Sequence, residues 1–155
     1  MFGEPGTGGA LQDIITMLIS TVLGTLVGWE RQAGRKPAGL RTHTLVCMGS
    51  TLFCLLTIHA ARDFGASTGV DPTRIIHGVV TGVGFLGAGS IMRQEGYVHG
   101  LTTAASIWMV AAIGVAVGVH AWTLAITGTV LALIVLEVFR WIEKRLAAAG
   151  QSREP

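Results

Sequence analysis

The charged residues of this chain are separated by long uncharged runs, and that spacing limits the folds open to it. Residues 14–29, 42–61 and 75–92 contain no Asp, Glu, Lys or Arg, and these runs are 16, 20 and 18 residues long. A membrane-spanning helix needs about 20 consecutive, mostly apolar residues. Each run is close to that length, so each predicts one membrane-spanning helix.

A fourth uncharged run is about twice as long as the others. It covers residues 96–136 and contains 41 residues. As a single helix it would extend about 60 Å at ~1.5 Å per residue, which is twice the ~30 Å hydrocarbon thickness of a bilayer. We therefore predict a helical hairpin that breaks at Gly118-Val119-His120, with a fourth helix over about 102–117 and a fifth that starts at about 121 and continues into the charged tail.

The composition agrees with a bilayer protein. Half of the residues are hydrophobic and 13% are charged, whereas soluble domains carry about 25% charged residues. The predicted fold is an all-α, polytopic membrane helix bundle with five transmembrane helices. Residues 1–10 are expected to form a short external segment, 11–145 the transmembrane domain, and 146–155 a cytoplasmic tail.

The basic residues predict the orientation of this bundle. With five spans, nine of the 11 Lys and Arg residues fall on one side and two on the other. Because Lys and Arg collect in cytoplasmic loops, we predict that the N-terminus is outside and the C-terminus inside. The small net charge of +2 is then concentrated at the cytoplasmic membrane surface, and we expect no nucleic-acid partner.

Polar residues are expected to gather at the cytoplasmic ends of the first four helices and in the loops that join them. A charge buried below the interface is costly unless it is paired, so one interpretation places Glu30 in an ion pair with Arg41 or Arg93. The other interpretation is that these residues only solvate helix ends. The candidate polar cluster consists of Glu30, Arg41, Thr42, Arg93, Thr102 and Thr103.

A glycine-rich segment lies in the third predicted helix, at Gly82, Gly84, Gly87 and Gly89. Each glycine costs roughly 1 kcal/mol relative to Ala in a helix interior, so the segment needs another explanation. Small residues at helical spacing permit close helix packing in membranes. Alternatively, the helix is broken there and its backbone lines a cavity.

The start of the third helix carries a capping signal. Asp71 is a candidate N-cap, and it precedes a proline, which is tolerated at the first helical position. Arg74 follows in the first turn. We expect Asp71 and Arg74 to form the outer cap of this helix.

The sequence offers little for catalysis or for metal binding. No nucleophile and base pair, phosphate-binding loop with a Lys, or metalloprotease motif is present. The histidines lack the short spacing of a zinc site, and few carboxylates are available for Mg²⁺. We therefore expect no enzyme activity, no catalytic residue, no metal site and no cofactor.

Five motifs occur in an order that resembles the membrane domain of the MgtC/SapB family. Residues 28–32 read Gly-Trp-Glu-Arg-Gln and residues 38–43 read Ala-Gly-Leu-Arg-Thr-His, and the three further motifs cover residues 71–75, 84–89 and 100–108. The resemblance implies a multi-pass protein of the bacterial inner membrane, linked to growth at low magnesium. For the MgtC branch it also implies links to virulence and to restraint of the proton-driven ATP synthase.

The chain also departs from the pattern of the MgtC branch. Thr102 and Met109 stand where that branch has Asn and Cys, and Gly78 replaces its usual Gln. A soluble C-terminal domain is expected to be missing, so the chain looks like a short, SapB-like member, and inhibition of the ATP synthase is not carried over to it.

Two functions remain open from the sequence. One is a regulatory membrane protein that acts through contacts with other inner-membrane proteins. The other is a transporter or channel component for a cation or small solute, with the polar cluster as its site. Besides the lipid bilayer, we expect a second copy of the chain as a partner, because abundant Gly favours helix association.

Overall fold

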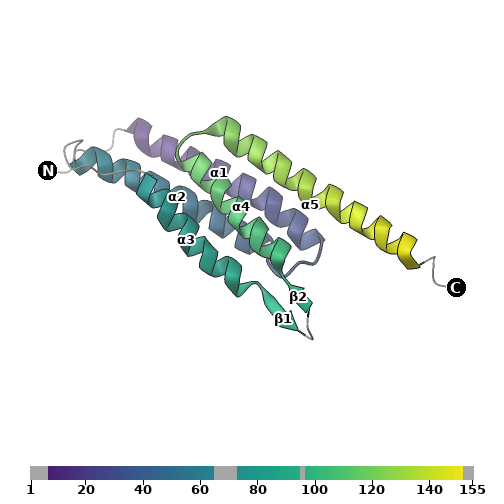
Figure 1. The fold of residues 1–155 in the computed structure, drawn as a ribbon. Helices are drawn as coiled ribbons and strands as arrows, with labels where there is room; N and C mark the ends of the chain where they lie inside the picture. The colour runs from purple at the N-terminus through teal and green to yellow at the C-terminus, as the bar shows by residue number, and fades with distance from the viewer. Residues whose placement is uncertain (1–6, 65–72, 95–96, 152–155) are drawn as a thin grey trace.

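The computed structural model describes residues 7–64, 73–94 and 97–151. The described chain is almost entirely helical (Figure 1), which confirms the predicted all-α membrane helix bundle. The elements are α1 (Thr7–Ala33), α2 (Leu40–Phe64), α3 (Thr73–Gly89), β1 (Met92–Gln94), β2 (Tyr97–His99), α4 (Leu101–Gly118) and α5 (Trp122–Gln151). Asp71 lies outside the described residues.

All five predicted helices are present. Within the described residues, α1, α2, α4 and α5 are long and apolar enough to cross a membrane, and α3 is a shorter apolar helix of 17 residues. At ~1.5 Å per residue, α3 is about 25 Å long, slightly less than the ~30 Å hydrocarbon core. The chain is therefore a multi-pass membrane protein, and its orientation in the membrane stays a prediction.

The helical hairpin forms where it was predicted. α4 ends at Gly118 and α5 begins at Trp122. Between them, His120 takes the left-handed backbone conformation, with φ of 60°. The amide of Ala121 donates to the carbonyl of Ala116 at 2.8 Å, so the turn satisfies a carbonyl that the end of α4 leaves free.

A short β-hairpin connects α3 to α4, where the sequence analysis expected only a loop. β1 pairs antiparallel with β2, and Arg93 lies opposite Val98. Gly100 then starts α4 with φ of 91°, and a Cβ there would overlap the carbonyl oxygen of Ser90. Three-residue strands carry too little alternation to be recognised in a sequence.

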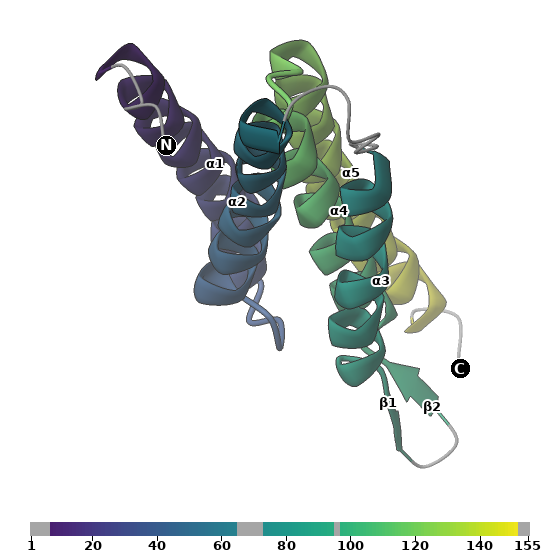
Figure 2. The ribbon, with the colours of Figure 1, turned by 90° about the vertical axis from the view of Figure 1, so that its left-hand side faces the viewer.

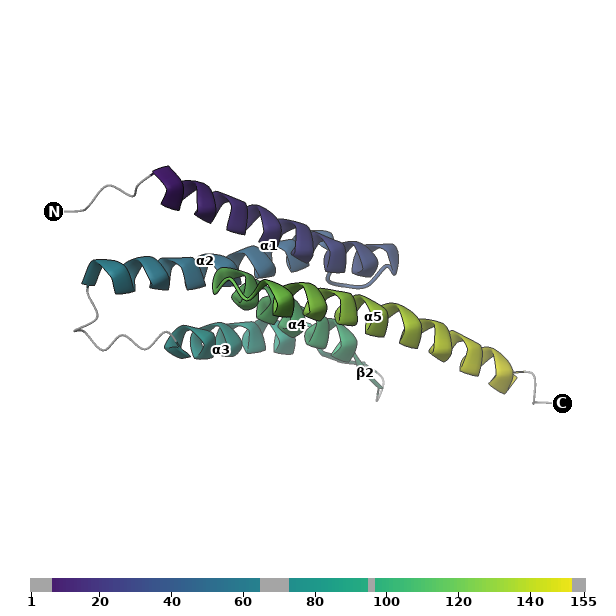
Figure 3. The same ribbon diagram turned by 90° about the horizontal axis from the view of Figure 1, so that it is seen from above.

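The central helix of the bundle is α4, which contacts each of the four other helices. Figure 3 shows it between α2, α3 and α5. Its buried residues lie on several faces and include Ile107, Val110, Ile113 and Val117. α3 contacts α4 but lies at the edge of the bundle.

Glycines bring α1, α2 and α4 into close contact. A Cβ on Gly24 of α1 would lie 2.7 Å from the Cβ of Cys47 on α2. A Cβ on Gly118 of α4 would lie 2.5 Å from the Cβ of Cys54. Real Cβ atoms do not approach this closely, so these positions require glycine.

The glycine segment of α3 behaves differently. α3 runs unbroken to Gly89, so the structure has no unwound backbone at Gly82 to Gly89. A Cβ on Gly82, Gly84 or Gly89 would meet nothing within 4 Å, and one on Gly87 would make an ordinary 3.7 Å contact with Ala104. Close packing among the described residues therefore does not require these glycines.

These two kinds of glycine should respond differently to alanine. Gly118→Ala forces the backbone of α2 and α4 apart, and overpacking of this kind typically costs about 1–3 kcal/mol. Gly84→Ala adds a methyl group in open space and improves helix propensity. The free energy of unfolding of this variant should therefore equal that of wild type or exceed it by up to roughly 1 kcal/mol. Thermal unfolding of both variants in the same detergent compares them. Equal losses would contradict the assignment of close packing to Gly118 and of open space to Gly84.

Candidate functional site

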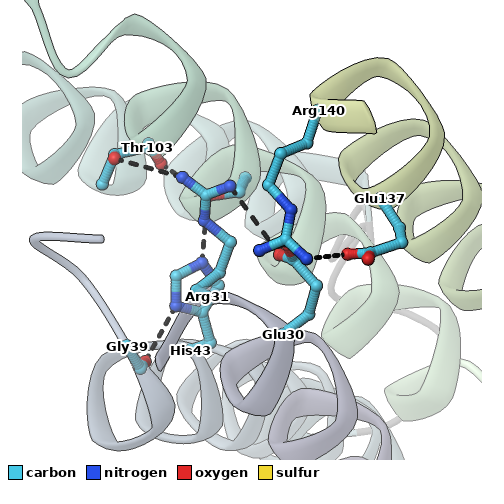
Figure 4. A network of polar contacts seen from close by, with 8 residues as sticks. Glu30, Arg31, Gly39, His43, Thr103, Glu137 and Arg140 are labelled. Carbon is cyan, nitrogen blue, oxygen red and sulfur yellow. Dashed lines mark hydrogen bonds and ion pairs between the residues drawn. The ribbon is translucent and has the colours of Figure 1, made fainter. Parts of the chain in front are cut away.

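A buried ion-pair cluster closes the bundle at the C-terminal end of α1. Glu30 and Arg31 lie in the last turn of α1, with side chains that are 10% and 3% exposed. Arg140 of α5 reaches Glu30 from the other side (Figure 4), and its Nη1 lies 3.6 Å from Glu30 Oε1. Arg31 Nη1 lies 3.7 Å from Glu30 Oε2. One carboxylate therefore lies between two guanidinium groups.

These ion pairs are loose. Charge-assisted N–H···O bonds are about 2.7–2.9 Å long, so separations of 3.6 and 3.7 Å are not hydrogen bonds. Both carboxylate oxygens of Glu30 and Nε of Arg31 are buried without a hydrogen-bond partner. Arg140 also donates to Glu137, one turn before it on α5. The two carboxylates and two guanidinium groups balance in charge.

Arg31 extends the cluster to α4, and His43 joins α2 to it. Arg31 Nη2 donates to Thr103 Oγ1 at 3.5 Å. The imidazole of His43 is fully buried, with Nδ1 2.9 Å from the carbonyl of Gly39 and Nε2 3.0 Å from Ser106 Oγ. Because a carbonyl only accepts, Nδ1 must donate to Gly39. Ser106 Oγ also lies 2.8 Å from the carbonyl oxygen of Thr103, and its single proton can be donated either to that carbonyl or to His43 Nε2. His43 thereby links α2 to α4.

A second polar layer lies deeper in the bundle. Thr51 Oγ1 on α2 lies 2.7 Å from Ser20 Oγ on α1 and 2.7 Å from the carbonyl oxygen of Gly114 on α4. Ser20 Oγ also lies 3.3 Å from Cys47 Sγ. These contacts tie three helices together inside the membrane, where polar groups need protein partners.

The structure brings together only part of the predicted polar cluster. Glu30 and Thr103 both belong to it, whereas Thr42 is half-buried outside these contacts. Arg41, Arg93 and Thr102 are exposed. The expected pairing of Glu30 with Arg41 or Arg93 is corrected, because its ion-pair partners are Arg31 and Arg140.

The geometry of α2 explains the error about Arg41. Most of the residues that α2 buries follow helical spacing on one face: His43, Cys47, Ser50, Thr51, Cys54 and Thr57. Arg41 falls outside that face, because it precedes His43 by two residues, or about 200° of helical rotation. Arg93 lies on the β-hairpin. At the other end of α3, Arg74 is exposed in the first turn.

Four residues of the site lie outside the candidate polar cluster that was predicted from the sequence: Arg31, His43, Ser106 and Arg140. Arg140 lies three residues after Glu137, a spacing that also fits an exposed pair on a single helix. Its contact with α1 depends on how α5 packs, which no local pattern shows. A signal for His43 was available, since it is a polar residue in an apolar helix, and such residues usually face the bundle interior.

Removing the central carboxylate should cost more stability than removing an exposed charge. Glu30→Gln leaves Arg31 buried and without its counter-charge, which typically costs about 3–5 kcal/mol. Arg140→Gln should cost less, because Arg140 is 28% exposed and Glu30 keeps Arg31. Arg41→Gln, at an exposed position, serves as the control and should stay within ~0.5 kcal/mol. Reversible unfolding in mixed micelles measures the differences, and a loss for Arg41→Gln as large as that for Glu30→Gln would contradict the assignment.

Comparison with known proteins shows the family to which the chain is similar. The model of the MgtC family matches residues 17–145. YhiD of Escherichia coli K12 is 45% identical over 135 residues, which cover 86% of this chain and 63% of YhiD. SrpB of Synechococcus elongatus is 40% identical over 146 residues, covering 89% of this chain and 80% of SrpB.

MgtC of Salmonella typhimurium LT2 is 37% identical over 145 residues, covering 90% of this chain and 60% of MgtC. The chain thus spans somewhat under two thirds of the length of YhiD and of MgtC. No solved structure matches it. On the extent of the family match and of these alignments, the chain belongs to the MgtC family.

Proposed function

We propose that this chain is a protein of the bacterial inner membrane that regulates other membrane proteins in magnesium homeostasis or stress survival, and that it does not itself conduct an ion. The magnesium link rests on membership of the family and on YhiD, which is named as a candidate magnesium transporter. Because the chain covers only 63% of YhiD, the mechanism is argued from the residues of this chain.

The observation that carries the proposal is the position of Glu30 between Arg31 and Arg140. Mg²⁺ takes six ligands, usually one or two carboxylates with several waters. In residues 7–64, 73–94 and 97–151 there is no group of three or more His, Cys, Asp and Glu residues that could hold a metal ion. A cation that approached Glu30 would meet two guanidinium groups at similar distance, and their repulsion offsets the attraction of the carboxylate.

The outer surfaces of the bundle fit a protein that binds other membrane helices. Gly84 and Gly89 are exposed on α3, with no Cβ to hold a neighbouring backbone away. Exposed small residues permit close approach of a partner helix. The expected partners are therefore other inner-membrane proteins or a second copy of this chain.

The loose contacts of Glu30 favour one alternative function. Because its carboxylate oxygens lack hydrogen bonds, a cation could bind there if Arg140 moved away with α5. The alternative is thus a transporter or channel component for a cation, with Glu30 as its binding group. It requires a separation of α1 from α5 that the regulatory function does not need.

A flux assay with a growth assay decides between the two functions. In proteoliposomes loaded with a magnesium-sensitive dye, and separately with a proton-sensitive dye, we expect wild type, Glu30→Gln and Arg41→Gln to leak no faster than empty vesicles. In a host that lacks its own family member, wild type should restore growth at limiting magnesium and Glu30→Gln should not, because the cluster no longer holds α1, α4 and α5 together.

Arg41→Gln is the matched control, since Arg41 is charged, near the same membrane face and exposed. It should restore growth like wild type. Gel filtration establishes that each variant is folded in the membrane extract. Flux through wild type and Arg41→Gln that is lost in Glu30→Gln would overturn the regulatory function and establish the transporter.

A further inference from the structure

An apolar groove lies between α2 and α3, which run side by side in Figure 2. Its volume is about 670 Å³, and its walls are almost entirely apolar. Phe53 and Gly49 contribute from α2, and Gly78, Gly82 and Leu86 contribute from α3. The groove is thus separate from the buried cluster around Glu30.

The groove stays open because its glycines have no side chain. A Cβ on Gly49, Gly78 or Gly82 would meet nothing within 4 Å, so no atom of the described chain requires glycine at these positions. Larger residues there would narrow the groove. Each glycine destabilises its helix by roughly 1 kcal/mol relative to Ala. What these glycines provide in return is open space that no described atom of the chain fills.

A positive charge stands at one end of this groove. Arg74 lines it from the first turn of α3, and its side chain is exposed. Leu86 lines the groove twelve residues further along, about 18 Å away at ~1.5 Å per residue. Half of a ~30 Å hydrocarbon core is about 15 Å. The groove therefore has a cation at one end and an apolar length that matches one leaflet.

We propose that this groove binds one phospholipid of the leaflet that contains the start of α3, with an acyl chain along Gly78 and Gly82 and the phosphate on Arg74. The charge at the end of the groove and its length both fit this ligand. A guanidinium group pairs well with phosphate oxygens. The first backbone amides of α3 point toward the same end and favour an anion as well.

A helix from a second copy fits the groove less well. The apolar face of a membrane helix offers no anion to Arg74 at the end of the groove, whereas a phospholipid carries a phosphate beside its acyl chains. An acyl chain is much thinner than a helix. The site does not depend on the regulatory function proposed above, because neither Glu30 nor its partners line the groove.

Native mass spectrometry of the full chain, with a synthetic phosphatidylglycerol added in detergent, tests the proposal. Gly82→Leu fills the groove, and Arg74→Gln removes its cation. Each should reduce the lipid that stays bound by about fivefold. The matched controls are Gly84→Leu, at an open glycine of α3 that does not line the groove, and Arg93→Gln, at an exposed arginine on β1. Both should bind lipid like wild type.

A phosphatidylglycerol with a photoreactive group on its acyl chain locates the site. We expect cross-links concentrated on α2 and α3 peptides that contain Gly49 or Gly82, and lost in Gly82→Leu. Uniform cross-links on all helices, or equal lipid retention in wild type and Arg74→Gln, would overturn the proposal. A dimer that is lost in Gly82→Leu, with lipid retention unchanged, would assign the groove to a second copy instead. Arg74→Gln changes an exposed residue, so it decides the question even if Gly82→Leu does not fold.

Discussion

Close approach of three helices is the constraint on which the rest of this structure depends. In a membrane, lipid tails are as apolar as helix surfaces, so helices associate through tight packing and hydrogen bonds. Glycines on α1 and α4 let both helices approach α2 closely, at Gly24 and Gly118 among others. This closeness brings Thr51 within hydrogen-bond distance of the Gly114 carbonyl. Larger residues at these positions would push the helices apart and break these hydrogen bonds. The polar groups would then have no partner, because the membrane interior contains no water.

The same packing determines the geometry at the end of the bundle. Because α1 lies against α2 and α4, Arg31 can reach Thr103 while the adjacent Glu30 faces Arg140 of α5. Consecutive residues on a helix point about 100° apart, so the last turn of α1 contacts both α4 and α5. The cluster adds to the packing of α5 on α1 and α4, although much of the described surface of α5 is exposed (Figure 1). Its balanced charge suits a connection between helices better than a path for cations.

The edge helix α3 contrasts with this core. It contacts α4 more extensively than α2, and most of its glycines face open space. An apolar helix whose glycines are open on several faces can accommodate different neighbours, which include lipid in the groove beside α2 and protein on its other exposed faces. The two proposals for this chain therefore use different surfaces. Regulation would depend on how the bundle presents α3 and α5, while the lipid site depends only on the gap beside Arg74.

The sequence by itself determined the helices and the break between the last two. Spans in a membrane need long uncharged runs, and the cost of burying charge makes those runs visible without any tertiary information. Glu30 and Thr103 were also part of the predicted cluster, since Glu30 borders such a run and Thr103 lies at the start of the predicted fourth helix. Tertiary structure alone decided that Arg140 pairs with Glu30, because that contact joins residues over a hundred positions apart. It also decided which glycines are needed for packing, since a glycine looks the same in the sequence whether a neighbouring backbone or open space lies beside it.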